Sequence, residues 1–337
     1  MGLWDFISNH KRIKFLFAPS NDTMVYWMYP IYKNLPNSSF IVFPKINENA
    51  EKVLQDLKLD YYKYEVGITK QIRPQIVIVG NDWGWSEMDL IKECHETRIT
   101  TVGIMEGLCK IEEIIPYKTV DYFFSLGVIP SKDLHYLKNK VNTGNPKFDK
   151  IKKTPFPKTQ RVLINSNFAY GNQKDKSHIW IGDTTTVCKK NSIDFLIAKH
   201  PRDEAKINKS LPSVLSNASK ISKLIRNSTI VISRSSTIIY EAIKAGRIVI
   251  VYNLFNETIG PLEHQKNSHL FFKTNSKTQL NNTLKHVLHS LKNYDYTINN
   301  QEYNLFIKNH LTTKSSSAKL CVKYLKKILQ KKLLQSG

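Results

Sequence analysis

The sequence TIVISRSSTIIYEAIKAGRIVIVYN, residues 229–253, decides the fold that we expect for this chain. It contains two short β-branched runs, Ile230–Ile232 and Ile248–Tyr252, separated by a hydroxyl-rich turn and a helical segment at Ile238–Lys244. Short apolar runs bounded by turn residues are typical of strands that are buried on both faces of a sheet. A strand, a helix and a second strand in this order predict a right-handed βαβ unit. The stretch therefore indicates an α/β protein with a parallel sheet.

The turn of this unit carries hydroxyl side chains and an arginine, in the order Ser233, Arg234, Ser235, Ser236 and Thr237. Such a turn lies where the strand ends and the helix begins, and the free backbone N–H groups there favour an anion. A single hydroxyl would be enough to cap the helix. We therefore expect the turn to bind a phosphate, with helix capping as the alternative.

The chain has 337 residues, of which 41% are hydrophobic, and this length suits two folded domains. Its net charge of +22 suits a polyanion, an anionic membrane surface or phosphate-bearing substrates, and does not decide among them. The cysteines have neither CxxC spacing nor paired histidines, so we expect no zinc site and no disulfide framework. They are Cys94, Cys109, Cys188 and Cys321.

The N-terminal segment MGLWDFISNHKRIK lacks the long apolar core of a secretory signal. No run of residues approaches the roughly 18 apolar residues that a membrane-spanning helix needs. Together with cysteines that fit a reducing compartment, this predicts a cytoplasmic protein, either soluble or peripheral to the inner face of a membrane.

Apolar runs alternate with helical segments on both sides of a polar segment that contains two prolines, KIKKTPFPKTQ at residues 150–160. This alternation predicts two Rossmann-like parallel-sheet domains that face each other across a cleft. We expect the domains at residues 1–152 and 153–302, followed by basic closing helices at residues 303–337. We also expect a strand over residues 61–66 and a helix over residues 214–224.

The C-terminal segment from Tyr303 to Gly337 has eight lysines and no acidic residue. Its apolar residues recur at helical spacing, at Ala318, Cys321, Val322, Leu325, Ile328 and Leu329. One interpretation is a closing helix that packs on the N-terminal domain and exposes a basic face. The other is an interfacial helix on anionic lipid. The two interpretations are compatible.

Polar residues gather at the predicted strand ends of the first domain, where ligands of such sheets bind. Ser20, Asp82 and the pair Glu106-Gly107 each follow a predicted strand, which makes them candidates for the acceptor side. Glu106 follows a β-branched strand and precedes a glycine, so its carboxylate is a candidate general base. The alternative for Glu106 and for Asp82 is to cap the following helix.

Polar residues also end the strands of the second domain, namely Asn165, Asn167 and the segment Lys199-His200-Pro201-Arg202. Pro201 restricts the preceding residue to extended geometry, so the His200 imidazole is expected to project from the strand end between two cations. There it can donate to a phosphate oxygen or protonate a leaving group, unless it is a structural histidine. Glu241, in the helix after the turn, can accept from ribose hydroxyls or form an ion pair within its helix.

Several common catalytic and cofactor motifs are absent from the sequence. There is no GxGxxG after the first strand and no GxxxxGK[ST], which disfavours dinucleotide and P-loop sites. There is also no HExxH and no GxSxG, which disfavours a metalloprotease and an α/β-hydrolase.

The order of the remaining motifs is Glu106-Gly107 in the first half, then His200-Pro201 and Ser235-Ser236 in the second. This order resembles that of bacterial sialyltransferases and polysialyltransferases, GT-B enzymes with acidic-Gly, HP and S-S/T motifs. It is also similar to the Kdo transferases of capsule and lipopolysaccharide assembly and to the CDP-glycerol glycerophosphotransferases of teichoic acid synthesis. Because the last group tends to carry a histidine before the glycine, Glu106 favours a CMP-activated acidic sugar.

The resemblance implies a GT-B glycosyltransferase that moves a sialic acid-like sugar or Kdo from CMP to a saccharide, without a metal or other cofactor. It implies that Glu106 activates the acceptor, that His200 contacts the phosphate, and that Ser235-Ser236 bind the nucleotide phosphate. Lys199 and Arg202 would offset the charge of the leaving group. The alternatives are a CDP-polyol phosphotransferase and, in another class, a basic nucleic-acid-binding protein. No sequence signature of nucleic-acid-binding modules is present.

Overall fold

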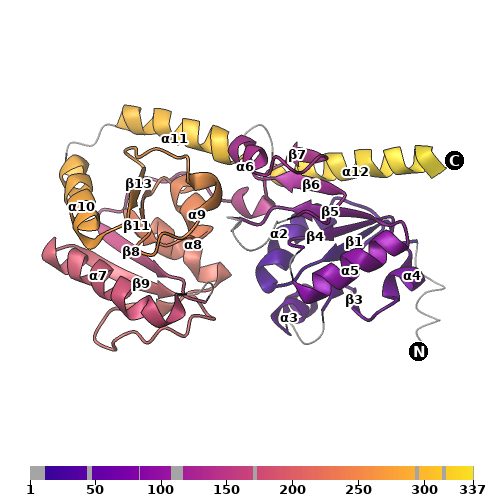
Figure 1. Cartoon of the computed structure of the whole chain (residues 1–337), viewed down its shortest axis with the longest axis horizontal. Helices are drawn as coiled ribbons and strands as arrows, with labels where there is room; N and C mark the ends of the chain where they lie inside the picture. Colours follow the sequence, from indigo (N-terminus) through magenta and orange to yellow (C-terminus); the bar gives the residue numbers. More distant parts are fainter. Residues whose placement is uncertain are drawn as a thin grey trace. The chain divides into compact units, whose positions relative to one another are not determined.

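The computed structural model describes residues 12–43, 48–82, 84–107, 117–169, 173–292, 296–312 and 316–336. The chain forms two compact units. The first comprises residues 1–106, 111–150 and 308–337, and the second comprises residues 107–110 and 151–307. Each unit is built around a parallel sheet flanked by helices (Figure 1).

The first unit has a seven-stranded sheet in the order β3-β2-β1-β4-β5-β6-β7, and all neighbouring strands are parallel. Strand numbers rise in both directions from β1, which is the doubly wound order of a Rossmann-like sheet. Its elements are β1 (Phe15–Ala18), α2 (Asp22–Tyr32), β2 (Ser38–Val42), α3 (Glu48–Asp56), β3 (Tyr61–Lys63), α4 (Ile68–Ile72), β4 (Ile76–Val79), α5 (Trp85–Glu96), β5 (Thr100–Ile104), β6 (Tyr122–Ser125), α6 (Val128–Asp133), β7 (Lys140–Asn142), the 3₁₀ helix η1 (Pro146–Phe148) and α12 (Ser317–Ser336).

Successive residues of the β1 strand enter two different cores of this unit. Phe15 and Phe17 pack in the core that includes α2 and α3, whereas Leu16 and Ala18 pack in the core that includes α4 and α5. A strand that is buried on both faces needs apolar residues at every position. This explains why the strands of the sheet appear in the sequence as continuous apolar runs.

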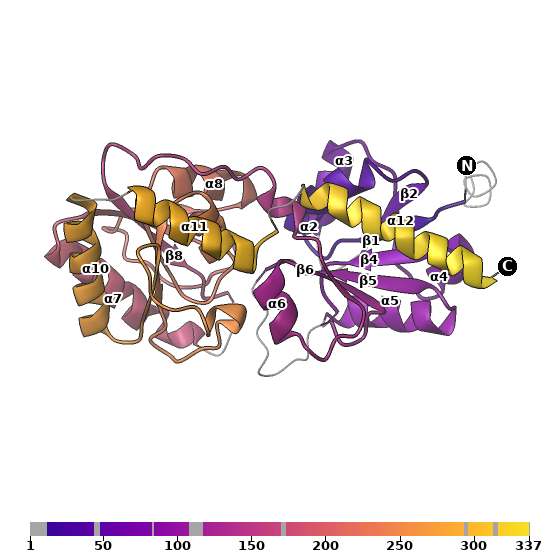
Figure 2. The ribbon, with the colours of Figure 1, turned by 90° about the horizontal axis from the view of Figure 1, so that it is seen from above.

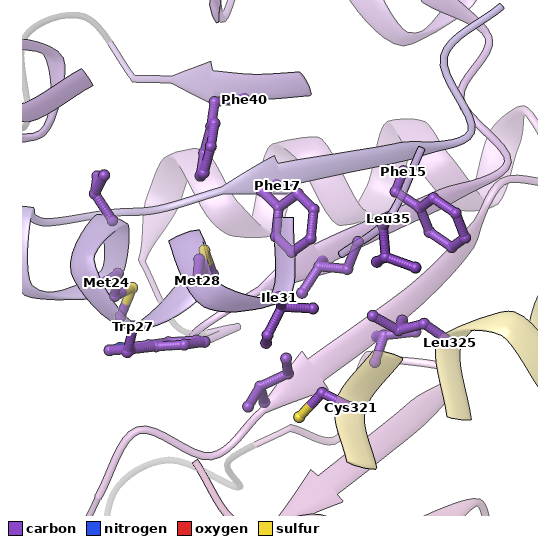
Figure 3. Packing of buried hydrophobic residues seen from close by; sticks show 14 of the residues in the cluster. Phe15, Phe17, Met24, Trp27, Met28, Ile31, Leu35, Phe40, Cys321 and Leu325 are labelled. Atoms are coloured by element: carbon purple, nitrogen blue, oxygen red, sulfur yellow. The ribbon is translucent and has the colours of Figure 1, made fainter. Parts of the chain in front are cut away.

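Helix α12 packs beside α2 on one face of this sheet (Figure 2). Its apolar stripe lies in the same core as Phe15 and Phe17, and comprises the buried residues Ala318, Cys321, Leu325, Ile328 and Leu329. Figure 3 shows Cys321 and Leu325 beside the side chains that β1 and α2 contribute to this core. The interpretation of the C-terminal segment as a closing helix packed on the first unit is confirmed.

Asp149 anchors the beginning of α12. Its carboxylate accepts hydrogen bonds from Ser316 Oγ at 2.7 Å, Ser317 N at 2.9 Å and Ala318 N at 3.1 Å. An acid at this place satisfies N–H groups that have no partner inside the helix and complements the helix dipole. A residue far away in the sequence therefore supplies the cap of α12.

The second unit has a six-stranded sheet in the order β10-β9-β8-β11-β12-β13, again with parallel neighbours throughout. The order is again doubly wound, starting from β8. Its elements are β8 (Arg161–Ser166), the 3₁₀ helix η2 (Lys174–Lys176), α7 (Ser177–Lys190), β9 (Asp194–Lys199), β10 (Ser213–Leu215), α8 (Ala218–Arg226), β11 (Ile230–Ser233), α9 (Ile238–Lys244), β12 (Ile248–Tyr252), the 3₁₀ helix η3 (Gly260–Leu262), β13 (Phe271–Thr274), α10 (Lys277–Lys292) and α11 (Tyr296–His310), whose last residues belong to the first unit. The predicted fold class, two Rossmann-like parallel-sheet units, is confirmed.

Two predicted elements differ from the structure. The helix expected over residues 214–224 is instead the edge strand β10 followed by α8, because Val214 and Leu215 pair with β9 and the Asn217 side chain caps a helix that begins only at Ala218. The strand expected over residues 61–66 ends at Lys63, since the chain then turns toward α4.

Three cysteines, Cys94, Cys188 and Cys321, are buried free thiols, and burial raises the pKa of each to about 12. Cys109 lies outside the described residues. In the described parts of the chain, no helix combines the length and the hydrophobicity that crossing a bilayer requires.

Because His310 at the end of α11 is buried, we expect the free energy of unfolding to fall in acid. The side chain is fully buried, and burial lowers the pKa of its imidazole from 6.5 to about 4. In the unfolded chain the imidazole is protonated below about pH 6.5, whereas in the folded chain it stays neutral down to about pH 4. The free energy of unfolding is therefore unaffected by His310 above pH 6.5 and falls as the pH drops from 6.5 to 4. The expected loss is about 1.4 kcal/mol per pH unit within this window. We expect His310→Gln to remove this slope in urea unfolding curves; equal slopes in the two proteins would contradict it.

Candidate functional site

The sheet of the second unit reverses its strand order between β8 and β11. In open α/β sheets, ligands bind just beyond the carboxyl ends of the strands at such a switch point. Two predicted site residues meet there: Asn165 Nδ2 on β8 donates to Ser233 Oγ on β11 over 3.0 Å, and both side chains are buried. This contact marks the ligand position that the fold predicts.

Ser235, Ser236 and Thr237 form the turn between β11 and α9 and are half-buried. Thr237 is the cap residue of α9, yet its side chain makes no capping hydrogen bond. Ser235 Oγ donates instead to the Thr258 carbonyl over 3.2 Å. The structure therefore does not support the alternative in which these hydroxyls serve only to cap the helix. Glu241 follows in α9 and is buried.

The segment with His200 leaves the end of β9, next to β8. His200 N donates to Ser166 O over 3.1 Å, and His200 Nδ1 accepts from Arg202 N over 3.2 Å. Because Nδ1 is an acceptor, the proton of the neutral ring is on Nε2, which is the donor a phosphate oxygen requires. Lys199 and His200 are half-buried, whereas Pro201 and Arg202 are exposed.

Asp203 fixes this segment, a role that the sequence did not predict. Its buried carboxylate accepts from Ser166 Oγ at 2.7 Å and from Ala205 N at 2.9 Å. The segment is thereby attached to β8 on both sides of Pro201. The only sign of this role in the sequence was an acidic residue three positions after the histidine. That spacing alone does not distinguish such a residue from any other acidic residue in a loop.

Arg234 differs most from the expectation based on the sequence. Its position in the turn predicts that its charge helps to bind a phosphate, but it forms a buried ion pair with Glu257, with Nε at 2.7 Å from Oε2 and Nη2 at 2.5 Å from Oε1. Its Nη1 donates to the Asn167 carbonyl over 2.8 Å, and the guanidinium lies 4.0 Å from the centre of the Phe168 ring. The positive charge in the turn is therefore neutralised by Glu257. The Oδ1 atom of Asn167 is buried and has no hydrogen-bond partner among the described residues.

The first unit has its own switch point, between β1 and β4. Asn81 lies two residues after the end of β4, and its Nδ2 donates to Ser20 Oγ over 2.8 Å, with both side chains buried. This contact is the counterpart of Asn165 and Ser233 in the second unit. Ser20 was predicted as a site residue from the sequence and Asn81 was not, although a polar residue just beyond a buried strand was an available signal.

The carboxylate of Asp82 is engaged by the segment that precedes β6. Its Oδ1 accepts from Tyr117 N at 2.6 Å, and its Oδ2 accepts from Thr119 N at 3.1 Å and Thr119 Oγ1 at 2.7 Å. Three hydrogen bonds to one buried carboxylate favour a structural role for Asp82 over contact with an acceptor.

Glu106 is half-buried and lies two residues after the end of β5, and the peptide unit that precedes it is held by hydrogen bonds. Glu106 N donates to the Tyr117 hydroxyl over 3.4 Å, that hydroxyl donates to Gly80 O over 2.7 Å, and Met105 O accepts from Asn145 Nδ2 over 3.0 Å. A general base needs such a fixed position. Gly107, the next residue, belongs to the second unit.

The predicted residues thus fall into two groups. Those of the second unit lie at the ends of β9, β8 and β11, apart from Glu241 in α9 and Gly107, whereas Ser20, Asp82 and Glu106 belong to the first unit. Within the described residues, no group of three or more His, Cys, Asp or Glu side chains is arranged to hold a metal ion.

The sequence matches no known protein family and no curated protein, but solved structures resemble the fold. A putative UDP-N-acetylglucosamine 2-epimerase from Listeria monocytogenes superposes with a TM-score of 0.67 at 12% identity, over 95% of this chain and 98% of the epimerase. The Methanocaldococcus jannaschii UDP-GlcNAc 2-epimerase, in complex with UDP-GlcNAc and UDP, gives 0.66 at 13% identity over 93% and 99%. The wall teichoic acid polymerase TagF with CDPG gives 0.61 at 12% identity over 97% and 91%. At these identities the likeness concerns the fold, which is GT-B.

Proposed function

We propose that this chain is a transferase that binds a nucleotide-activated donor in its second unit. The observation that carries the proposal is the arrangement at the β8–β11 switch point, where the His200 segment follows β9 and the Ser235–Thr237 turn follows β11, the two strands that flank β8 in one sheet. Hydroxyls, an Nε2–H donor and two nearby cations, Lys199 and Arg202, suit the phosphate of a nucleotide.

For the donor, we propose a CMP-linked acidic sugar, on the basis of the motif order Glu106-Gly107, His200-Pro201 and Ser235-Ser236. In this reaction Glu106 accepts the proton of an acceptor hydroxyl while that oxygen attacks the anomeric carbon. The bond from this carbon to the phosphate oxygen breaks, and CMP leaves with the negative charge. Lys199, Arg202 and the His200 Nε2–H stabilise that charge. Asn167 and Glu241 are proposed contacts of the nucleoside.

A second candidate is the transfer of a polyol phosphate from a CDP-linked donor. The similarity in fold to TagF, solved with CDPG, supports this alternative. The two candidates share the nucleotide base and differ in the bond that breaks, which lies at the sugar carbon in the first and at phosphorus in the second.

We further propose that the acceptor is a saccharide, free or lipid-linked, in the assembly of a bacterial capsule or lipopolysaccharide. The protein would then work at the cytoplasmic face of the membrane. The exposed lysines of α12 support this proposal, because a row of cations beside an anionic leaflet is attracted to it. They are Lys319, Lys323, Lys326, Lys327 and Lys331.

We expect CMP or CDP to raise the melting temperature of the protein, and His200→Ala or the double variant Ser235→Ala/Ser236→Ala to abolish this rise. A ligand that binds only the folded state at 100 times its Kd stabilises it by about 2.7 kcal/mol. The melting temperatures without ligand should change little, since these side chains are not core residues. Thermal shift with CMP, CDP, UMP, UDP and GDP measures this. Stabilisation by UDP alone would contradict a cytidine donor and favour a uridine nucleotide, as in the epimerase complex.

A further inference from the structure

The buried ion pair between Arg234 and Glu257 joins the ends of neighbouring strands around the Ser235–Thr237 turn. Arg234 follows β11 and Glu257 lies in the loop after β12. The guanidinium meets both carboxylate oxygens, at 2.7 and 2.5 Å, and the side chains are only 3% and 10% exposed. Such a two-point contact between planar groups fixes orientation as well as distance.

The same guanidinium reaches a third strand. Its Nη1 donates to the carbonyl of Asn167, just beyond β8, and its plane lies over the Phe168 ring. One side chain therefore connects the carboxyl ends of β8, β11 and β12, the strands on both sides of the switch point.

The loop that carries Glu257 is itself held in place. Asn253 Oδ1 accepts from Glu257 N and Asn253 Nδ2 donates to Glu257 O, each over 2.7 Å. Ser235 Oγ, in the turn, donates to the carbonyl of Thr258 in this loop. Consecutive residues of the turn are thus bound to consecutive residues of the loop, which sets the direction in which the hydroxyls of the turn point.

We propose that Arg234 and Glu257 are positioning residues of the nucleotide site: together with the Ser235 hydroxyl, which donates to the Thr258 carbonyl, they hold the Ser236 and Thr237 hydroxyls in place for a nucleotide phosphate without touching the phosphate themselves. This inference rests on the proposed nucleotide site. Contribution to stability is a weak explanation for the pair, because a buried ion pair often contributes no more than apolar side chains of the same volume. Direct contact with phosphate is also a weak explanation, since Glu257 already neutralises the guanidinium.

The test replaces both partners at once, with Arg234→Met/Glu257→Leu, so that no unpaired charge is left buried. We expect the melting temperature of this variant to stay close to that of the wild type, while its affinity for CMP or CDP falls about tenfold to a hundredfold because the turn loses its orientation. Isothermal titration of the full-length protein measures the affinity. Wild-type affinity in the double variant would overturn the proposal.

Arg247 supplies a matched control in the same unit. It is also a fully buried arginine, but it lies just before β12, at the amino ends of the strands and not at their carboxyl ends. It donates to the carbonyls of Thr154, Pro155 and Ala245. Arg247→Met should lower the melting temperature and leave nucleotide affinity unchanged. If the Arg247 variant lost as much nucleotide affinity as the Arg234/Glu257 variant, general destabilisation would explain both losses, and the proposal would be overturned.

Hydrogen exchange separates this inference from the proposed function. In the double variant, the amides of residues 234–238 and 254–259 should exchange faster, with unchanged protection in β8 and β12. If the wild type binds none of the nucleotides, the proposed function fails. The exchange result still decides whether the pair orders the turn, and unchanged exchange in the turn would overturn the positioning role.

Discussion

Glu106→Gln is expected to lower turnover of the proposed transfer about 10²- to 10⁴-fold, the usual contribution of a general base. Glutamine has nearly the shape of glutamate but does not accept a proton from the acceptor hydroxyl. The peptide unit between Met105 and Glu106 is held by Tyr117 and Asn145. The substitution therefore should leave the position of the side chain, and the fold, unchanged.

The measurement is single-turnover transfer, with nucleotide affinity determined in parallel. Affinity for CMP or CDP should stay at the wild-type value, because the nucleotide is assigned to the second unit. Glu93→Gln is a matched control: this buried carboxylate of the same unit accepts from Gly67 N and Thr69 N, so its loss should lower stability and not turnover. If Asp82→Asn abolished turnover and Glu106→Gln did not, Asp82 would be the general base and the assignment of Glu106 would be wrong.

The fold could be predicted well because its strands are buried on both faces. The helix Ile238–Lys244 and the strand Ile248–Tyr252 were predicted with the bounds that the structure shows. A strand at the edge of a sheet has no such pattern. Val214 and Leu215 stand among polar residues and pair on one side only, so the strand β10 appeared in the sequence as the beginning of a helix.

The candidate site could be predicted only in part, for a different reason. Residues that end a buried strand, such as Asn165 and Ser233, are visible as polar positions after apolar runs. Asp203 and Glu257 act through partners far away in the sequence, and the local pattern does not identify those partners. Arg234 was predicted incorrectly for the same reason. Its position in the turn indicated contact with a phosphate, but its charge is neutralised by Glu257, which lies 23 positions later in the sequence.

Deleting residues 316–337 is expected to unfold the first unit, because α12 is part of its core. Burying a leucine or isoleucine side chain contributes about 1.5–3 kcal/mol, so Leu325, Ile328 and Leu329 together account for about 5–9 kcal/mol. This is as large as the whole stability of many domains, about 5–15 kcal/mol. The deletion also removes the N–H donors that the Asp149 carboxylate binds. Circular dichroism and expression as soluble protein measure the result, and a truncated protein with wild-type melting temperature would contradict the packing of α12.

Because deletion destroys the fold, a role of α12 at the membrane needs a different variant. Replacing Lys319, Lys323, Lys326, Lys327 and Lys331 by glutamine removes exposed charge and leaves the buried stripe intact. Lys332 is retained, since its Nζ donates to the carbonyls of Gln75 and Arg98 at 3.0 Å each and so belongs to the fold. Each lysine near an anionic leaflet is worth about 1 kcal/mol. We therefore expect the wild type to bind vesicles that contain phosphatidylglycerol at low salt and to be released by added salt. The substituted protein should remain folded and unbound. If the wild type ignores anionic vesicles at low salt, the lysines serve only to solvate the outer face of a structural helix.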